Sequence, residues 1–209
     1  GKYISTDVVA AQLLLMADGV GSMTPLTESR LFIETANWNQ KRILIQRAGG
    51  FGDLVLMTPV LREIKRRWPD CHLAVSTMTH YSVALQALPF VDELLQFPIP
   101  MEVADKFDAW IFYENAIEKN ARARELHITE LFAEIAGLTD VLDLKPEYRI
   151  KVTEAIWAAE AYPREPGRRR VAVQVGAAAR IRRYPLFGET CVEMTKRGWE
   201  VMLLGTPGE

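Results

Sequence analysis

Residues 42–62 constrain the fold of this chain more than any other segment. Their apolar run Ile43–Ile45 is bounded by arginines, which is typical of a strand covered on both faces. Three glycines follow, and they let the backbone turn tightly and leave room for a ligand: Gly49, Gly50 and Gly52. Apolar residues then recur at helical spacing as far as Ile64, so Asp53 falls near the N-terminus of a helix.

Asp53 is the carboxylate of this segment that needs an explanation. The structural interpretation is that it caps the helix, which is common for aspartate and worth about 1 kcal/mol. The functional interpretation is that a ligand meets the carboxylate at the end of the strand. The glycines do not decide between the two, because similar loops occur in dinucleotide-binding, methyltransferase and other α/β folds.

Strand and helix signals alternate from Ile43 to about Tyr148. Further strands are predicted at residues 72–76, 91–97 and 108–113, and helices through residues 83–85 and 128–138, the last ending at Gly137. Such alternation predicts an α/β fold with a Rossmann-like, doubly wound parallel sheet. Ligands of such sheets bind at the carboxyl ends of the strands, where Asp53 lies.

Composition excludes several classes of protein. The 209 residues are 49% hydrophobic with a formal net charge of -2, so the chain is neither disordered nor generally attracted to nucleic acid. Cys71 and Cys191 are too few for a disulfide scaffold or a metal knuckle, and the three histidines have no ligand spacing. The two cysteines far apart in the sequence fit a reducing cytoplasm, and no apolar run has the length of a membrane span. No acidic pair has metal-ligand spacing either, so we expect a cytoplasmic protein without a bound metal.

A second α/β unit is predicted after a connector. Strands at residues 171–175 and 201–204 flank a helix, and prolines and a glycine break the chain before them. The predicted organisation is a helical N-terminal extension (1–40), a first Rossmann-like domain (41–150), a linker (151–170) and the start of a second domain (171–209).

Two motifs, in this order, resemble the ADP-heptose:lipopolysaccharide heptosyltransferases, which form glycosyltransferase family 9. The first motif is a strand, a basic residue, a small-residue loop ending in Gly-Asp and a Thr-Pro-x-Leu-Arg helix. Its matches are Arg47, Gly49, Gly50, Gly52, Asp53, Thr58, Pro59, Leu61 and Arg62. The second is a strand, a glycine, a basic residue two positions before an aromatic-Pro pair, and a later Gly-x-Pro-Gly-Glu. Its matches are Gly176, Arg182, Tyr184, Pro185, Gly205, Pro207, Gly208 and Glu209.

The resemblance implies a GT-B fold and an inverting, metal-independent glycosyltransferase that needs no cofactor. Such an enzyme would move a sugar, expected to be heptose, from a nucleotide donor such as ADP-heptose to a lipopolysaccharide core or related glycan. This acceptor implies peripheral contact with the inner face of the inner membrane. Asp53 is the candidate base that takes the proton of the acceptor hydroxyl, and at a helix N-terminus it is expected to stay ionised.

The remaining site residues are assigned from the same motifs. The donor and its phosphates are assigned to Gly49, Gly50, Gly52, Gly176, Arg182 and Tyr184. Arg182 would neutralise the departing diphosphate. The acceptor is assigned to Arg47, Arg62 and His127, with pairing to a carboxylate as the alternative for Arg47. For the basic residues 65–67, a solvated helix face is sufficient.

Two departures from the family leave other interpretations open. Ala177–Ala179 replace the hydroxyl residues that the family tends to place after Gly176, and most of a complete second domain is missing by comparison. The chain is then a fragment of a longer enzyme, a diverged homologue, or half of a site completed by an oligomer or a second chain. A non-catalytic binding or assembly protein is the alternative function. A dinucleotide-binding or methyl-transferring enzyme would need an acidic residue after the second strand, and residues 76–78 supply none.

Overall fold

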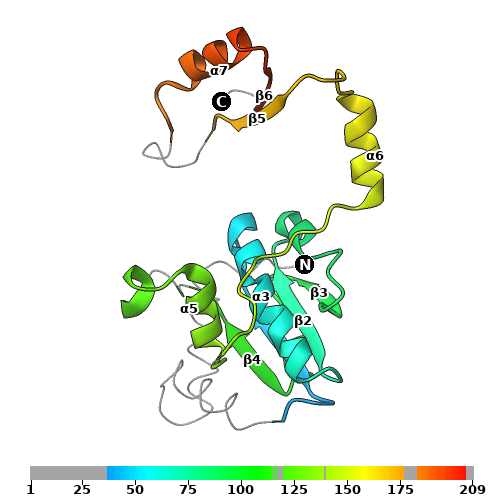
Figure 1. Cartoon of the computed structure of the whole chain (residues 1–209). Helices are drawn as coiled ribbons and strands as arrows, with labels where there is room; N and C mark the ends of the chain where they lie inside the picture. Colours follow the sequence, from blue (N-terminus) through cyan, green and yellow to red (C-terminus); the bar gives the residue numbers. More distant parts are fainter. Residues whose placement is uncertain (1–36, 115, 117–119, 139, 177–182, 206–209) are drawn as a thin grey trace. The chain divides into compact units, whose positions relative to one another are not determined.

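The computed structural model describes residues 37–114, 116, 120–138, 140–176 and 183–205 (Figure 1). The chain divides into two compact units between Ile150 and Lys151, and each unit is described by itself. Most of the predicted helical extension, and Arg182, lie outside the described residues. The predicted domain boundaries therefore stay predictions, although a helix occupies part of the predicted linker.

The first unit is built around strands and helices that alternate along the chain. Its elements are β1 (Arg42–Gln46), α3 (Phe51–Arg67), β2 (His72–Thr77), the 3-10 helix η1 (Thr79–Ala84), β3 (Glu93–Gln96), α4 (Met101–Ala104), β4 (Ala109–Phe112), the 3-10 helix η2 (Ala121–Arg124) and α5 (Ile128–Ile135). Each predicted strand is found within two residues of its predicted bounds. The helix predicted through residues 83–85 is a 3-10 helix that ends one residue earlier, at Ala84.

The four strands form one parallel sheet in the order β3-β2-β1-β4. Ile45 lies at the centre, paired in register with Val75 on one side and Ile111 on the other. The predicted doubly wound parallel sheet is therefore confirmed. In this order the carboxyl ends of β2 and β4 flank the end of β1, so the loop before α3 lies between them.

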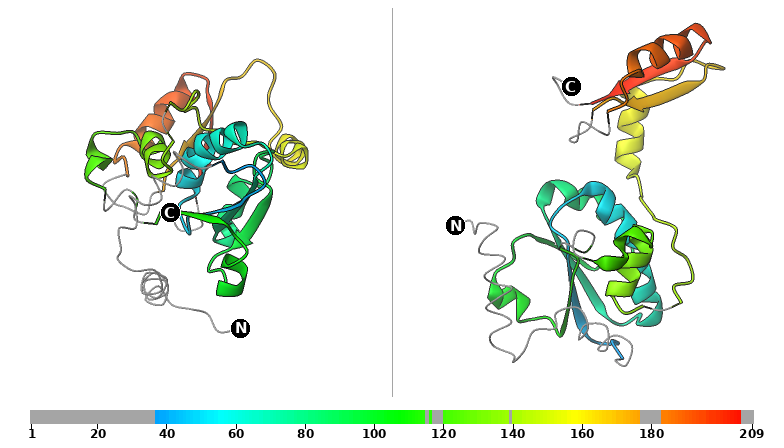
Figure 2. Two further views of the ribbon diagram at one scale, coloured as in Figure 1. Left: turned by 90° about the horizontal axis from the view of Figure 1, so that it is seen from below. Right: turned by 90° about the vertical axis from the view of Figure 1, so that its left-hand side faces the viewer.

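The sheet is covered on both faces (Figure 2). Ile43 and Ile45 belong to the main core, which also contains buried residues of α3 and α5. Leu44 points to the opposite face and packs with Ala74 and Phe107 in a smaller cluster. Burial of both faces explains why β1 is a continuous apolar run in the sequence.

Helix α3 contains a proline whose missing N–H is compensated locally. Pro59 has no N–H to donate to the carbonyl of Val55, four residues earlier. The hydroxyl of Thr58 donates to that carbonyl instead, at 2.7 Å. The same hydroxyl oxygen accepts the backbone N–H of Glu147, at 2.8 Å. The Thr-Pro pair thus keeps α3 intact and attaches a distant segment to it.

That segment, residues 143–148, is called the strap. Arg62 lies one turn beyond Thr58 and donates to the carbonyls of Asp143 (2.9 Å) and Lys145 (3.1 Å). It also forms ion pairs with the carboxylates of Asp143 and Glu147. At the other end of the helix, the ring of Tyr148 meets that of Phe51 edge to face, with centroids 5.6 Å apart. The strap therefore runs along α3 toward its N-terminus.

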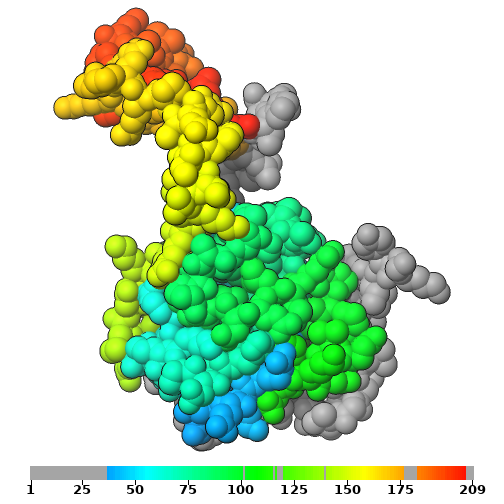
Figure 3. All heavy atoms as spheres, turned by 90° about the vertical axis from the view of Figure 1, so that its right-hand side faces the viewer, coloured from blue at the N-terminus to red at the C-terminus, as the bar shows by residue number. Residues whose placement is uncertain are grey.

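The second unit contains one small parallel sheet. Its elements are α6 (Val152–Ala161), β5 (Arg170–Gln174), α7 (Phe187–Lys196) and β6 (Glu200–Leu204), with β5 paired to β6. None of its described apolar residues is buried. Figure 3 shows α6 in yellow with its side chains at the surface, and Trp157 of this helix is 62% exposed. Parallel strands are normally covered on both faces. The described part of this unit instead leaves its apolar side chains at least partly exposed, unlike the first unit.

The Thr58 hydroxyl gives the first testable prediction. Replacing Thr58 with Val leaves the Val55 carbonyl and the Glu147 N–H without their partner, which should lower the free energy of unfolding by about 1–3 kcal/mol. Thr129→Val is the matched control, because the Thr129 hydroxyl is equally buried but has no partner among the described residues. Denaturant unfolding of both variants measures the difference. Equal losses would contradict the assignment.

Glu63 gives a prediction about pH. Its carboxylate is 4% exposed and accepts hydrogen bonds from Arg66 (2.7 and 2.8 Å) and Arg67 (2.8 Å). The hydrogen bond from Arg66, opposed by burial and assisted by Arg67, lowers the pKa of Glu63 from its ordinary value of 4.5. Because the pKa in the folded state is lower, the interaction stabilises the fold above the ordinary value and is lost as the pH falls through the folded value.

The variant that tests this is Glu63→Gln, which keeps the shape of the side chain but not its charge. It should be less stable than the parent by about 1–2 kcal/mol near neutral pH. The difference should shrink below the ordinary pKa, because the parent then loses its own charge. Urea unfolding over a pH series measures this, with Glu102→Gln as the exposed control. A difference independent of pH would contradict the ion-pair explanation.

Candidate functional site

The glycine loop between β1 and α3 is held by the end of the neighbouring strand β2. The N–H of Arg47 donates to the carbonyl of Ser76 (3.0 Å), and the N–H of Met78 donates to the carbonyl of Ala48 (3.0 Å). The hydroxyl of Thr77 reaches the same Ala48 carbonyl at 3.2 Å. The loop is thus fixed against the end of β2 before any ligand is considered.

Gly50 is required by the backbone and by Asp53. It is the residue before the first turn of α3 and has φ +86°, which side chains rarely adopt. A Cβ atom at this position would lie 2.8 Å from the carboxyl carbon of Asp53. A Cβ at Gly52 would meet no atom within 4 Å, and one at Gly49 would make ordinary contact with Tyr81. The space at Gly50 is therefore occupied by the protein's own carboxylate, and phosphate binding by the three glycines stays a prediction.

Asp53 is the third residue of α3, as its predicted position near the helix N-terminus requires. In the described part of the chain its carboxylate accepts no backbone N–H, so Asp53 lies in the first turn without capping the helix by a hydrogen bond. Instead, its Oδ2 atom lies 2.5 Å from Nη2 of Arg47. The Asp53 side chain is 27% exposed, so solvent reaches it at the edge of the sheet.

Arg47 joins three parts of the first unit. Its Nε donates to the carbonyl of Gly49 (3.1 Å), its Nη1 to the carbonyl of Tyr113 (2.8 Å), and its Nη2 to Asp53. Of the two alternatives that the sequence left open for Arg47, the structure shows the pairing with a carboxylate.

Glu114 lies at the same edge and was missed from the sequence. It follows β4, and its carboxylate accepts the backbone N–H of Ala48 in the glycine loop. The signal was available, because Glu114 is an acidic residue directly after a strand whose carboxyl end lies beside that of β1. The loop is thus flanked by two carboxylates, those of Asp53 and Glu114.

Aromatic side chains surround the loop. The ring of Tyr81 lies beside Gly49 and contacts that of His80 at a tilt of 52°, with centroids 3.9 Å apart. On the α3 side, Phe51 is 39% exposed and contacts Tyr148. Sugars present apolar C–H faces together with hydroxyl groups. A carboxylate bordered by exposed aromatic rings suits such a ligand.

Arg62 and His127 are not brought to Asp53. Arg62 lies nine positions after Asp53, about 13 Å along α3, and its guanidinium is bound by the strap. His127 precedes α5 and caps it, because Nδ1 accepts the N–H of Thr129 (3.3 Å) and Glu130 accepts the N–H of His127 (2.8 Å). Both residues have structural functions here, and acceptor binding by them stays a prediction.

Three of the predicted donor residues, Gly176, Arg182 and Tyr184, belong to the second unit. Gly176 follows β5, and its carbonyl accepts from the side chain of Gln174 (3.3 Å). Tyr184 is half exposed and meets Phe187 edge to face, with centroids 5.3 Å apart. Arg182 lies outside the described residues. Donor binding by this group is therefore untested by the geometry.

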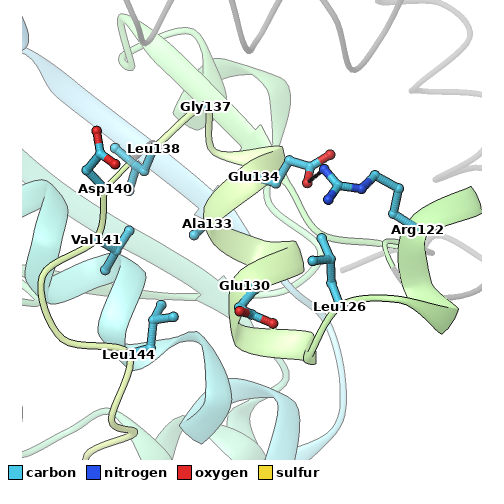
Figure 4. Close-up of a pocket in the computed structure, with 10 residues that line it drawn as sticks. All are labelled: Arg122, Leu126, Glu130, Ala133, Glu134, Gly137, Leu138, Asp140, Val141 and Leu144. Atoms are coloured by element: carbon cyan, nitrogen blue, oxygen red, sulfur yellow. Dashed lines mark hydrogen bonds and ion pairs between the residues drawn. The ribbon is translucent and has the colours of Figure 1, made fainter.

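A cavity of about 300 Å³ lies elsewhere, beside α5 (Figure 4). It shares no residue with the glycine loop. Leu126, Ala133 and Leu138 are among its apolar lining, and Arg122 pairs with Glu134 at its rim. Across the part of the chain that the structure describes, no three His, Cys, Asp or Glu side chains are grouped to hold a metal ion. Within the same residues, no helix is both long and apolar enough to span a bilayer.

Comparison with known proteins identifies the fold. No protein-family profile and no curated protein matches the sequence. Among solved structures, the chain is similar to a family 9 glycosyl transferase from Veillonella parvula DSM 2008 (TM-score 0.66, 16% identity, covering 82% of this chain and 64% of that one). It is also similar to E. coli ADP-heptose lps heptosyltransferase II (TM-score 0.58, 15% identity, covering 80% and 65%).

A third similar structure is TibC, a dodecameric, iron-containing glycosyltransferase from enterotoxigenic E. coli H10407 (TM-score 0.58, 13% identity, covering 82% of this chain and 45% of that one). The chain thus spans 45–65% of the length of these three proteins. At such identities the likeness establishes the fold. The chain has an α/β fold like that of these glycosyltransferases, with a Rossmann-like parallel sheet in its first unit and a smaller parallel sheet in its second.

Proposed function

We propose that this protein is a glycosyltransferase that moves a sugar from a nucleoside diphosphate to a hydroxyl of a glycan acceptor, with inversion at the anomeric carbon and without a metal. The observation that carries the proposal is the partly exposed position of Asp53 at the carboxyl edge of the sheet. One oxygen of this carboxylate is held by Arg47, and exposed aromatic rings border the site. The GT-B fold supports the same reaction class.

The proposed step needs one proton acceptor. The acceptor hydroxyl gives its proton to Asp53 as its oxygen forms a bond to the anomeric carbon. The bond from that carbon to the diphosphate oxygen breaks on the opposite face, which inverts the configuration. The leaving diphosphate takes the electron pair. Its negative charge needs cationic or N–H partners. The sequence resemblance assigns the nucleotide to Gly176, Arg182 and Tyr184.

The proposed donor is ADP-heptose. Two structural neighbours support this choice, since one is heptosyltransferase WaaC with ADP and another is TibC in complex with ADP-D-beta-D-heptose. The proposed acceptor is a lipopolysaccharide core or related glycan. We place the reaction in the cytoplasm at the inner face of the inner membrane, by the resemblance of the two sequence motifs to this family.

A non-catalytic binding or assembly protein is the second candidate function. The observation that favours it is the ion pair itself, because Arg47 and Asp53 also hold the glycine loop in place. If the Asp53 carboxylate only stabilises the fold, the protein binds or assembles with other molecules without catalysing a reaction. The two functions differ in what happens when the charge of Asp53 is removed.

Asp53→Asn makes that distinction. The amide keeps the shape and can still accept a hydrogen bond from Arg47, but it takes up no proton. Turnover of ADP-heptose should fall about 10²–10⁴-fold and donor affinity by calorimetry should change little, while loss of the charge opposite Arg47 should lower stability by only about 1–2 kcal/mol. Asp105→Asn, at an exposed position, is the control. Parent-like turnover of Asp53→Asn would contradict the catalytic assignment and favour the scaffold.

The glycine loop provides a second test. In Gly50→Ala the added methyl group collides with the Asp53 carboxylate and meets an unfavourable backbone, so turnover and stability should both fall, stability by about 1 kcal/mol or more. In Gly52→Ala the methyl group meets no atom within 4 Å, so Asp53 keeps its position. Transferase rates and unfolding midpoints of the pair are the measurement. Equal losses in both variants would show that the position of Asp53 is not what matters.

A further inference from the structure

The Arg47 guanidinium is almost entirely buried, yet it lies at the site edge. The residue is 8% exposed, and its three nitrogens donate to three different segments of the first unit. An arginine placed this way presents little of its charge to a diffusing acceptor. Its contacts lie within the protein, so the predicted direct contact with the acceptor does not describe its main interaction.

One hydrogen-bond partner of Arg47 belongs to a residue of the hydrophobic core. The carbonyl that accepts from Nη1 belongs to Tyr113, whose side chain is fully buried and donates its hydroxyl to the carbonyl of Phe132 in α5 at 2.9 Å. Desolvation of the Tyr113 hydroxyl raises its pKa, so this hydroxyl remains a donor. Arg47 is therefore tied to a rigid part of the fold, and its guanidinium plane is fixed.

The second terminal nitrogen of Arg47, Nη2, determines the orientation of Asp53. Nη2 binds Oδ2 alone, and Oδ1 has no hydrogen-bond partner among the described residues. Gly50 lies against the same oxygen, because a Cβ at this position would collide with Oδ2 and would lie 2.8 Å from the carboxyl carbon. Both contacts therefore involve the Oδ2 side of the carboxylate, which leaves Oδ1 as its free oxygen.

We propose that Arg47 is the positioning residue for Asp53, binding Oδ2 so that Oδ1 is the oxygen that receives the proton of the acceptor hydroxyl. This rests on the proposed transferase function. The proton leaves the hydroxyl for Oδ1, and Arg47 keeps its own protons and its charge throughout. Arg47 then acts on the rate of the chemical step through Asp53, and not on the affinity for the acceptor.

A double-mutant cycle on the 209-residue chain tests this. Arg47→Gln should lower kcat about 10–100-fold, because a displaced catalytic group costs rate, while KM for the acceptor stays within about twofold. In the Asp53→Asn background, Arg47→Gln should cause no further loss, since there is no base left to position. Arg47→Lys keeps one charged donor and should recover part of kcat. Arg197→Gln, which removes an exposed arginine paired with one carboxylate, is the control.

Three results would overturn the inference. Multiplication of the two effects in the double variant would show that Arg47 acts independently of Asp53. A raised acceptor KM with unchanged kcat would show that Arg47 binds the acceptor directly. If Arg47→Gln fails to fold by circular dichroism, Arg47→Lys alone is decisive, and parent-like kcat in that variant overturns the inference. Absence of turnover by the unaltered chain overturns the proposed function, and this inference with it. Turnover by the unaltered chain with parent-like kcat in the Arg47 variants overturns this inference alone.

Discussion

The ion pair between Arg47 and Asp53 is the interaction on which the organisation of this site depends. It connects the end of β1 with the first turn of α3, and through the Tyr113 carbonyl it also includes the end of β4. Arg47 would be costly to bury without these partners, because a desolvated charge needs compensation. The glycine loop, the position of Asp53 and the contact with β4 are therefore parts of one arrangement.

Helix α3 also contains motif residues that the sequence alone suggests are ligand contacts. Thr58, Pro59 and Arg62 fall in a motif that suggests contact with a ligand. In the structure Thr58 replaces the hydrogen bond that Pro59 cannot make, and with Arg62 it holds the strap. The strap reaches Phe51 at the N-terminus of the helix, two residues from Asp53. These motif residues thus shape the surroundings of the site without facing it.

The sequence was sufficient for the sheet and for the position of Asp53, because burial on both faces and helical spacing are local signals. It was not sufficient for the partners of the charged groups. Arg47 binds a carbonyl 66 residues away, and Arg62 binds carbonyls more than 80 residues away, so neither contact has a local pattern. His127 was assigned to the acceptor from its place before a helix, where its ring caps that helix. Glu114 could have been found by asking which acidic residues follow strands adjacent to β1.

A carboxylate that stabilises a fold and one that performs chemistry are usually alternatives, but a carboxylate has two oxygens. Here Arg47 binds Oδ2, and of the two carboxylate oxygens only this one takes part in holding the loop. A hydrogen bond that fixes one oxygen also limits rotation of the group, so the other oxygen has a defined direction at no further entropic cost when a ligand arrives. Buried charge pairing of this kind is therefore compatible with a catalytic function, provided that the partner is held as firmly as Tyr113 holds Arg47.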